Sequence, residues 1–309
     1  MPTPILIDTD MGVDDAVAIA LALASGDLEV AGLASVGGNV SLDQATLNIG
    51  RLLAGLGKET WPLMGRGLDQ AQVGLRDASH VFGEDGLGGC SLPPPGRLET
   101  LDYLDLYERC IETHGRELVI LAIGPLTNLA GVLRHRSGLL QRAGRIVVMG
   151  GAVWCKGNVT PHAEFNFYRD PGAAAAVLAA GLPVTVVPLD VTRQVALDES
   201  HVAQLSRAGT RAGDLLAEMI RFPLEAEGDA AHGSFLVHDA LALGAVIWPP
   251  LFMRAQMALE VVVAGEQAGR SKPLVAKDKS RQIGVVMSVK VVDFVENMLE
   301  RLCHQGFVV

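Results

Sequence analysis

The chain has 309 residues, 49% of them hydrophobic, and a formal net charge of −10 at pH 7. This composition excludes an intrinsically disordered chain, and the negative charge argues against nucleic acid or an anionic membrane surface as a partner. No apolar stretch reaches the roughly 18 residues of a membrane span, and the N-terminus shows no export signal. The four cysteines are scattered without a C-x-x-C pair, as is typical of a reducing compartment. We therefore expect a soluble cytoplasmic protein.

Short apolar runs alternate with segments of helical spacing along the chain. Buried strands are predicted at residues 4–8, 29–35, 117–123, 145–150 and 183–190. Helices are predicted between them at residues 13–25, 43–56, 126–133 and 171–180. A mainly helical region from about 195 to 250 is followed by two late strands and a closing helix, predicted at residues 258–265, 281–289 and 291–303. The alternation is typical of an α/β fold with a mostly parallel sheet flanked by helices, and no linker divides residues 1–309 into separate domains.

Four aspartates crowd the end of the first predicted strand, in the stretch "ILIDTDMGVDD" that contains Asp8, Asp10, Asp14 and Asp15. In open parallel sheets, ligands bind beyond the carboxyl ends of the strands. A helix dipole stabilises one carboxylate by only about 0.3–1 kcal/mol, which is too little to hold several together. A hard divalent cation would do so, although not in an EF-hand loop, because Ile19 occupies the twelfth position. The alternative is a capped, solvated helix start.

Other polar residues follow later strands and are expected at the same edge of the sheet. They occur in three segments: "VGGN", the polar loop 156–171, and "VHDALALGAV", where they stand at the start of a predicted helix. The residues concerned are Asn39, Asn158, Glu164, Asn166, His238 and Asp239. Carboxamides beside a carboxylate suit the recognition of hydroxyl groups. Each segment alone is explained by turn or capping chemistry, but their convergence on one edge favours a binding site.

The motifs "DTDMGVDDA" (8–16), "VGGN", "GPLTN", "GNVTPHAEFN" and "HD" together resemble the nucleoside hydrolases of the inosine–uridine preferring type. The resemblance runs from the first strand to the last helix. It implies a nucleoside hydrolase α/β fold with a Rossmann-like core and a tightly bound Ca²⁺. It also implies hydrolysis of the N-glycosidic bond of a small-molecule ribonucleoside to ribose and free base, in a homodimer or homotetramer.

The resemblance implies roles for individual residues of this chain. Asp10 would be a metal ligand and the general base on a metal-bound water, and His238 would be the acid for the leaving base. The other implied metal ligands are Asp15, Asp239 and the backbone carbonyl of Ile123. The implied substrate-binding residues are Asp14, Asn39, Asn158, Glu164 and Asn166. Asp8 is expected to orient the acidic turn by hydrogen bonds.

The sequence does not indicate which base the enzyme releases. Phe82 stands where several members of the family have a histidine, and Trp154 either stacks on a base or packs. The stretch 220–235 is expected to cover the base, and it carries Phe222, Glu225, Glu227 and His232 in place of the tyrosines of some members. Two further interpretations are a hydrolase of another ribosyl compound and a non-catalytic ribose- or nucleoside-binding module.

Overall fold

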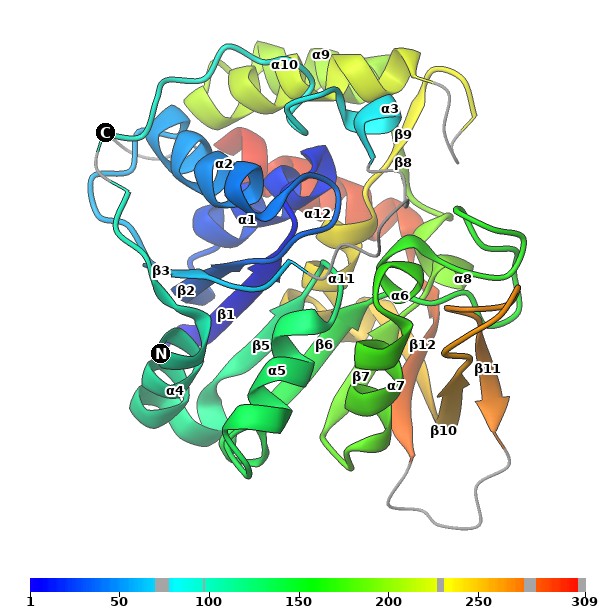
Figure 1. Cartoon of the computed structure of the whole chain (residues 1–309). Coiled ribbons are helices and arrows are strands. Elements are labelled where there is room, and N and C mark those ends of the chain that lie inside the picture. Colours follow the sequence, from blue (N-terminus) through cyan, green and yellow to red (C-terminus); the bar gives the residue numbers. More distant parts are fainter. Residues whose placement is uncertain (70–77, 97, 227–230, 275–281, 305–309) are drawn as a thin grey trace.

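The computed structural model describes residues 1–69, 78–96, 98–226, 231–274 and 282–304. Among these residues, ten strands form one sheet in the order β11-β10-β12-β7-β6-β5-β1-β2-β3-β4 (Figure 1). The strands are β1 (Thr3–Thr9), β2 (Leu28–Ser35), β3 (Leu63–Arg66), β4 (Leu101–Asp102), β5 (Val119–Ala122), β6 (Arg145–Met149), β7 (Val184–Val187), β10 (Phe252–Val261), β11 (Ser271–Leu274) and β12 (Ile283–Val289). All neighbours from β4 to β12 are parallel, and β10 is antiparallel to both β12 and β11. The sheet is therefore mostly parallel, as predicted.

Helices cover both faces of the sheet (Figure 1). Side chains of β1 alternate between the two faces: Ile5 and Ile7 pack into one apolar core and Leu6 into the other. The first core is completed by α1 (Val13–Ala24), α2 (Leu42–Gly55), α9 (Glu199–Arg207), α10 (Arg211–Glu225), α11 (His238–Ile247) and α12 (Val291–His304). The second is completed by α4 (Tyr103–His114), α5 (Thr127–His135) and α7 (Pro171–Ala179). No helix within the described ranges is long and apolar enough to cross a membrane.

Most of the predicted elements are confirmed, with shifts at their ends. The strand predicted at 183–190 ends at Val187, because Pro188 cannot donate to the sheet and the next residues form the short helix α8 (Leu189–Thr192). β10 begins six residues before the predicted start at 258, in an exposed antiparallel segment without a continuous apolar run. The first residue of the strand predicted at 281–289 lies outside the described residues.

Two short strands interrupt the region that was predicted to be mainly helical. β8 (Ala196–Asp198) and β9 (Ser234–Leu236) pair antiparallel in a separate two-stranded sheet, with Ala196 opposite Leu236. Three residues are too few to give a periodic pattern, so the sequence did not predict them. The pairing brings the chain after β7 alongside the start of α11. In Figure 1, α11 lies beside α8 and below α9 and α10.

Candidate active site

A cavity of about 450 Å³ lies at the carboxyl-end edge of the parallel strands. Predicted site residues from five separate segments line it, namely Asp14, Asn39, Ile123, Asn158, Glu164, Asn166, His238 and Asp239. Asp10 and Asp15 are fully buried and lie outside the cavity lining. The sequence therefore identified one common location, because parallel strands present their carboxyl ends at a single edge.

Hydrogen bonds within the β1–α1 turn fix its shape. Thr9 Oγ1 donates to Asp15 Oδ1 at 2.5 Å, and the backbone N–H of Gly12 donates to Asp15 Oδ2 at 2.8 Å. Met11 has φ of 55°, a left-handed conformation that is uncommon for a residue with a side chain. Such conformations are held by the surrounding contacts and cluster at functional sites.

The expectation that the side chain of Asp8 orients this turn is wrong. The Asp8 carboxylate accepts hydrogen bonds from Tyr107 Oη at 2.7 Å and Asn128 Nδ2 at 2.9 Å, on helices α4 and α5. Thr9 supplies the contacts to the turn instead. The backbone carbonyl of Asp8 accepts a hydrogen bond from the N–H of Ile123 at 2.8 Å, so this residue does help to hold the segment that follows β5.

Asn39 holds two of the buried carboxylates. Its backbone N–H donates to Asp10 Oδ2 at 2.8 Å, and its Nδ2 donates to Asp10 Oδ1 at 3.1 Å and to Asp15 Oδ2 at 3.2 Å. A Cβ on the preceding residue, Gly38, would lie 2.0 Å from Asp10 Oδ2, so this position accepts only glycine. Asn39 therefore orients Asp10 as well as lining the cavity.

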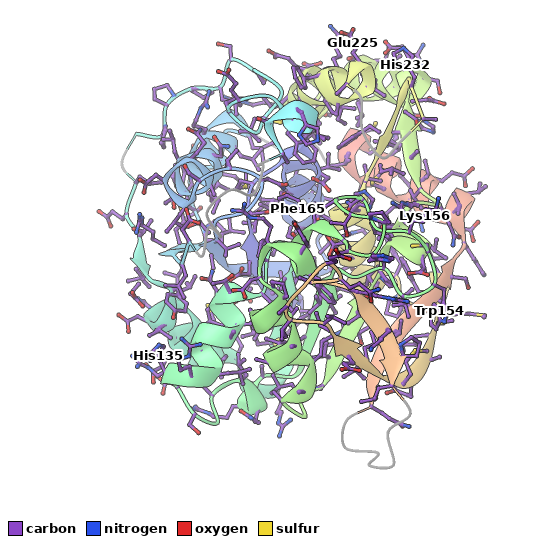
Figure 2. All side chains as sticks on the ribbon, turned by 45° about the vertical axis from the view of Figure 1, so that its right-hand side comes forward. His135, Trp154, Lys156, Phe165, Glu225 and His232 are labelled. Atoms are coloured by element: carbon purple, nitrogen blue, oxygen red, sulfur yellow. The ribbon has the colours of Figure 1, made fainter. Side chains whose placement is uncertain are left out.

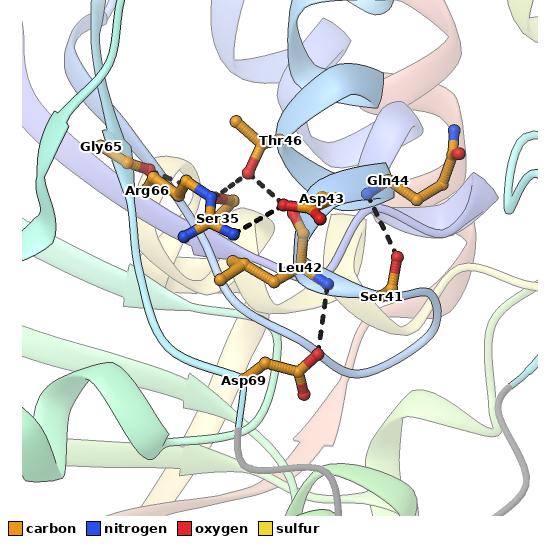
Figure 3. Close-up of polar contacts among 9 residues, drawn as sticks. All are labelled: Ser35, Ser41, Leu42, Asp43, Gln44, Thr46, Gly65, Arg66 and Asp69. Carbon is orange, nitrogen blue, oxygen red and sulfur yellow. Dashed lines mark hydrogen bonds and ion pairs between the residues drawn. The ribbon is translucent and has the colours of Figure 1, made fainter.

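Polar contacts beneath the loop that carries Asn39 fix its two ends (Figure 3). At the end of β2, Ser35 Oγ lies 2.7 Å from Thr46 Oγ1 on α2. At the start of α2, Ser41 Oγ accepts a hydrogen bond from the N–H of Gln44, which caps the helix. The loop is thereby attached to β2 at one end and to α2, which packs on the sheet, at the other.

A cluster of carboxylates forms the acidic part of the site. Carboxylate oxygens of Asp14, Asp15 and Asp239 lie within 4.8 Å of one another, and all three residues are buried. Burial, together with the charge of the neighbouring carboxylates, raises the pKa of Asp14, Asp239 and Asp10 well above the usual aspartate range. Burial also raises the pKa of Asp15, against the hydrogen bond from Thr9.

This donor set fits a hard divalent cation. The oxygens are carboxylate oxygens, which Ca²⁺ and Mg²⁺ prefer. Asp14 Oδ1 is buried and has no hydrogen-bond partner among the described residues. A buried acceptor without a donor costs free energy that a cation or a substrate hydroxyl would recover. The buried acidic cluster therefore offers a cation the kind of ligand that it prefers.

The sugar-loop residues are bound to the backbone around them. Glu164 caps α6 (Phe165–Arg169), and its carboxylate accepts N–H groups of Asn166, Phe167 and Gly151 at 2.7, 3.1 and 2.9 Å. Burial raises the pKa of Glu164, and the three backbone donors oppose that shift. Since a carboxylate offers about four acceptor positions, one remains for a ligand.

Asn166 supports the carbonyl that was predicted to bind a metal. Its Nδ2 donates to the carbonyl oxygen of Ile123 at 3.0 Å and to that of Met149 at 3.2 Å. Asn158 is exposed at the cavity, and its Oδ1 accepts the backbone N–H of Phe165 at 2.9 Å. These bonds leave the Asn158 amide nitrogen as a donor toward the cavity.

Aromatic and histidine side chains line the same cavity as the carboxylates. Phe82, Phe165 and Phe235 line it together with His80 and His238. Phe165 and Phe235 were not predicted, because an apolar residue beside a turn gives no signal that separates a binding contact from core packing. His238 Nδ1 lies 2.7 Å from Thr192 Oγ1.

Several residues that the sequence left open do not line this cavity. Trp154 and Phe222 are 54% and 41% exposed and lie outside its lining. Figure 2 shows Glu225 and His232 near the top edge of the molecule, away from Phe165. Glu227 lies outside the described residues. The cavity combines buried carboxylates with aromatic side chains, which suits a neutral substrate that carries hydroxyl groups beside a flat ring.

Comparisons with known proteins agree with this geometry. Residues 5–296 match the family model described as inosine-uridine preferring nucleoside hydrolase. The chain is 35% identical over 271 residues to uridine nucleosidase 1 of Arabidopsis thaliana, covering 86% of this chain and 80% of that one. It is 35% identical over 269 residues to the pyrimidine-specific ribonucleoside hydrolase RihA of Citrobacter koseri, covering 86% of each.

A solved structure extends the similarity to the whole fold. The purine-preferring ribonucleoside hydrolase from Gardnerella vaginalis superposes with a TM-score of 0.92 at 30% identity, covering 99% of this chain and 100% of that one. The chain therefore belongs to the family of inosine–uridine preferring nucleoside hydrolases. It is an enzyme of the N-ribosyl hydrolase type, and its fold is the nucleoside hydrolase α/β fold that the sequence motifs implied.

Proposed function

We propose that the chain is a Ca²⁺-dependent ribonucleoside hydrolase in which Asp10 is the general base and His238 is the acid for the leaving base. The observation that carries this proposal is the buried acidic cluster, with its unpartnered Asp14 Oδ1, in the same cavity as His238. The cavity offers the two kinds of group that this reaction needs. The carboxylates would withdraw a proton and support positive charge, and the histidine would supply a proton.

Asp10, Asp15, Asp239 and the carbonyl of Ile123 would hold the cation. When bound, a divalent cation lowers the pKa of water and orients it. Asp10 would accept the proton of the attacking water. Asn39 would keep both carboxylate oxygens of Asp10 in place during that transfer. Asn166 would in turn keep the Ile123 carbonyl turned toward the cation.

The sugar would lie over the acidic end of the cavity. Asp14 would accept a ribose hydroxyl, with Asn39, Asn158, Glu164 and Asn166 around the remaining hydroxyls. Cleavage of the bond between C1′ and the base nitrogen builds positive charge on the ribose ring, as in glycoside hydrolysis. Carboxylate and amide oxygens fixed beneath the ring would stabilise that charge without having to reorganise.

His238→Ala is expected to lower kcat on natural nucleosides by about 10²-fold or more, because general acid catalysis typically contributes that much. The same variant should change the rate on nitrophenyl riboside far less, since an activated leaving group needs no proton. Steady-state kinetics on both substrates would test this. Equal losses on the two substrates would remove His238 from the role of acid.

The proposed activity is tested by release of reducing sugar in the presence of Ca²⁺. The panel contains inosine, adenosine, guanosine, uridine, cytidine and nitrophenyl riboside. Ribose from any natural nucleoside would support the proposal and reveal the base preference. Cleavage of the nitrophenyl compound alone would point to a hydrolase of another ribosyl compound, and no release from any substrate would favour a binding module.

The proposal includes a cytoplasmic homodimer or homotetramer. The cytoplasmic location is supported by the scattered thiols, all four of which are free in the structure. The oligomeric state is inferred only from the resemblance to the family. Light scattering on the purified protein would measure it.

A further inference from the structure

A single hydrogen bond connects the candidate acid to a residue with no assigned role. His238 Nδ1 and Thr192 Oγ1 lie 2.7 Å apart, although the two residues are separated by 46 positions in the chain. Thr192 is fully buried at the end of α8, whereas His238 is partly exposed to the cavity. Among the described residues, the Thr192 hydroxyl has no partner other than His238.

The backbone holds both partners on one rigid unit. The N–H of Val195 donates to the carbonyl of Thr192, and the N–H of Val237 donates to the carbonyl of Val195. Immediately beyond them, β8 and β9 pair antiparallel. Thr192 and His238 therefore flank the same short ladder, which fixes the distance between them.

Further hydrogen bonds hold the helical turn α8, which carries Thr192. The backbone N–H of Thr192 donates to the carbonyl of Pro188 at 3.1 Å. Two residues earlier, the Asp190 carboxylate accepts the N–H groups of Val153 and Trp154, each at 2.8 Å. The threonine hydroxyl is thus presented by a helical turn that is tied to a neighbouring loop, which fixes its position relative to the imidazole ring.

The hydrogen bond to Thr192 gives the two ring nitrogens of His238 different tasks. The Thr192 hydroxyl can accept the proton of Nδ1 both from the imidazolium and from the neutral ring that keeps its proton on Nδ1. In both states Nδ1 is occupied, so the proton that moves is the one on Nε2. The hydrogen bond that one ring nitrogen makes determines which of the two nitrogens transfers the proton.

We infer that Thr192 is a positioning residue that orients His238 so that Nε2 delivers the proton to the departing base. The inference rests on the proposed role of His238 as acid. As the C1′–N bond breaks, its electron pair goes to the base, and Nε2 of the imidazolium gives its proton to that base. The ring is left neutral, with its remaining proton on Nδ1 hydrogen-bonded to Thr192 Oγ1, and solvent restores the proton on Nε2.

The test compares Thr192→Val with Thr192→Ser in the full-length enzyme. Valine keeps the size of the side chain and removes the hydroxyl, so kcat on a natural nucleoside should fall about 3- to 10-fold, the typical effect of one hydrogen bond. KM should stay within about twofold of the wild-type value, because the sugar contacts are unchanged. Thr192→Ser keeps the hydroxyl and should recover most of the lost kcat.

The ratio of rates on a natural nucleoside and on nitrophenyl riboside separates positioning from folding. Thr192→Val should lower the rate on the natural nucleoside and spare the nitrophenyl compound. Thr127→Val is the matched control, because it removes a buried hydroxyl that bonds to Asp170 at 2.9 Å outside the cavity lining. The control should keep the wild-type ratio even if it lowers stability.

A third comparison places Thr192→Val in the His238→Ala background, where it should cause no further loss, since the two residues act as a unit. If His238→Ala fails to discriminate the two substrates, the proposed acid is wrong. If His238→Ala does discriminate and Thr192→Val lowers both rates equally, or neither, the positioning role of Thr192 is overturned.

Discussion

Asp10→Asn is expected to lower kcat on ribonucleosides by about 10²–10⁴-fold, the contribution of a positioned general base. The amide cannot accept the proton of the attacking water. It also conflicts with its surroundings, because both Asp10 oxygens accept hydrogen bonds from Asn39, and an amide nitrogen at either position would face a donor. Steady-state kinetics with a saturating cation would measure the loss.

The control for this variant is Asp43→Asn. Asp43 also pairs through its carboxylate, with Arg66 Nη2 at 2.6 Å, but on the surface, where its side chain is 84% exposed (Figure 3). Exposed ion pairs contribute little, so its turnover should stay close to that of the wild type. Unchanged turnover in Asp10→Asn would remove Asp10 from the mechanism, and equal losses in both variants would mean that the assay reports general damage.

The location of the site could be predicted from the sequence because it follows from strand ends. Asp14, Asn39, Ile123 and His238 come from distant segments, yet each lies just after a strand or at the start of a helix. A parallel sheet brings such positions together whatever the details of packing. The alternation of apolar runs and helical spacing was sufficient to predict that sheet.

The hydrogen-bond partners within the site could not be predicted in the same way. The sequence indicated that Asp8 would orient the acidic turn, but its side chain reaches Tyr107, which lies 99 residues along the chain. Likewise, no pattern in the sequence pairs Thr192 with His238, because three-residue strands leave no periodic signal. Partner choice depends on packing between layers, which local patterns do not encode.

Removal of divalent cations is expected to destabilise the protein most at neutral pH. Burial and mutual repulsion raise the pKa values of Asp10, Asp14 and Asp239 well above the usual range, and burial raises the pKa of Asp8 to about 7. Without a cation, the folded protein therefore binds more protons than the unfolded chain above about pH 4. The free energy of unfolding then falls as the pH rises through these raised pKa values, and below about pH 4 this loss is absent.

A cation replaces those protons, so its stabilising effect should grow from pH 5 to pH 7.5. Free Ca²⁺ at about 100 times its Kd would add about 2.7 kcal/mol to the free energy of unfolding. For a chain of 309 residues, that corresponds to a rise in Tm of about 4 °C. Thermal unfolding followed by circular dichroism, in chelator and in Ca²⁺ at both pH values, would measure the difference.

Asp239→Asn separates the effect of the cation from the effect of buried charge. The substitution removes one of the mutually repelling carboxylates, so the metal-free variant should be at least as stable as the metal-free wild type at pH 7.5. It also removes a predicted ligand, so most of the rise in Tm with Ca²⁺ should disappear. If the wild type has the same Tm in chelator and in Ca²⁺ at pH 7.5, protons alone neutralise the cluster and the assignment of Ca²⁺ fails. If Mg²⁺ gives the larger rise, the site prefers the smaller ion, and the carboxylates must then approach one another more closely than a Ca²⁺ site requires.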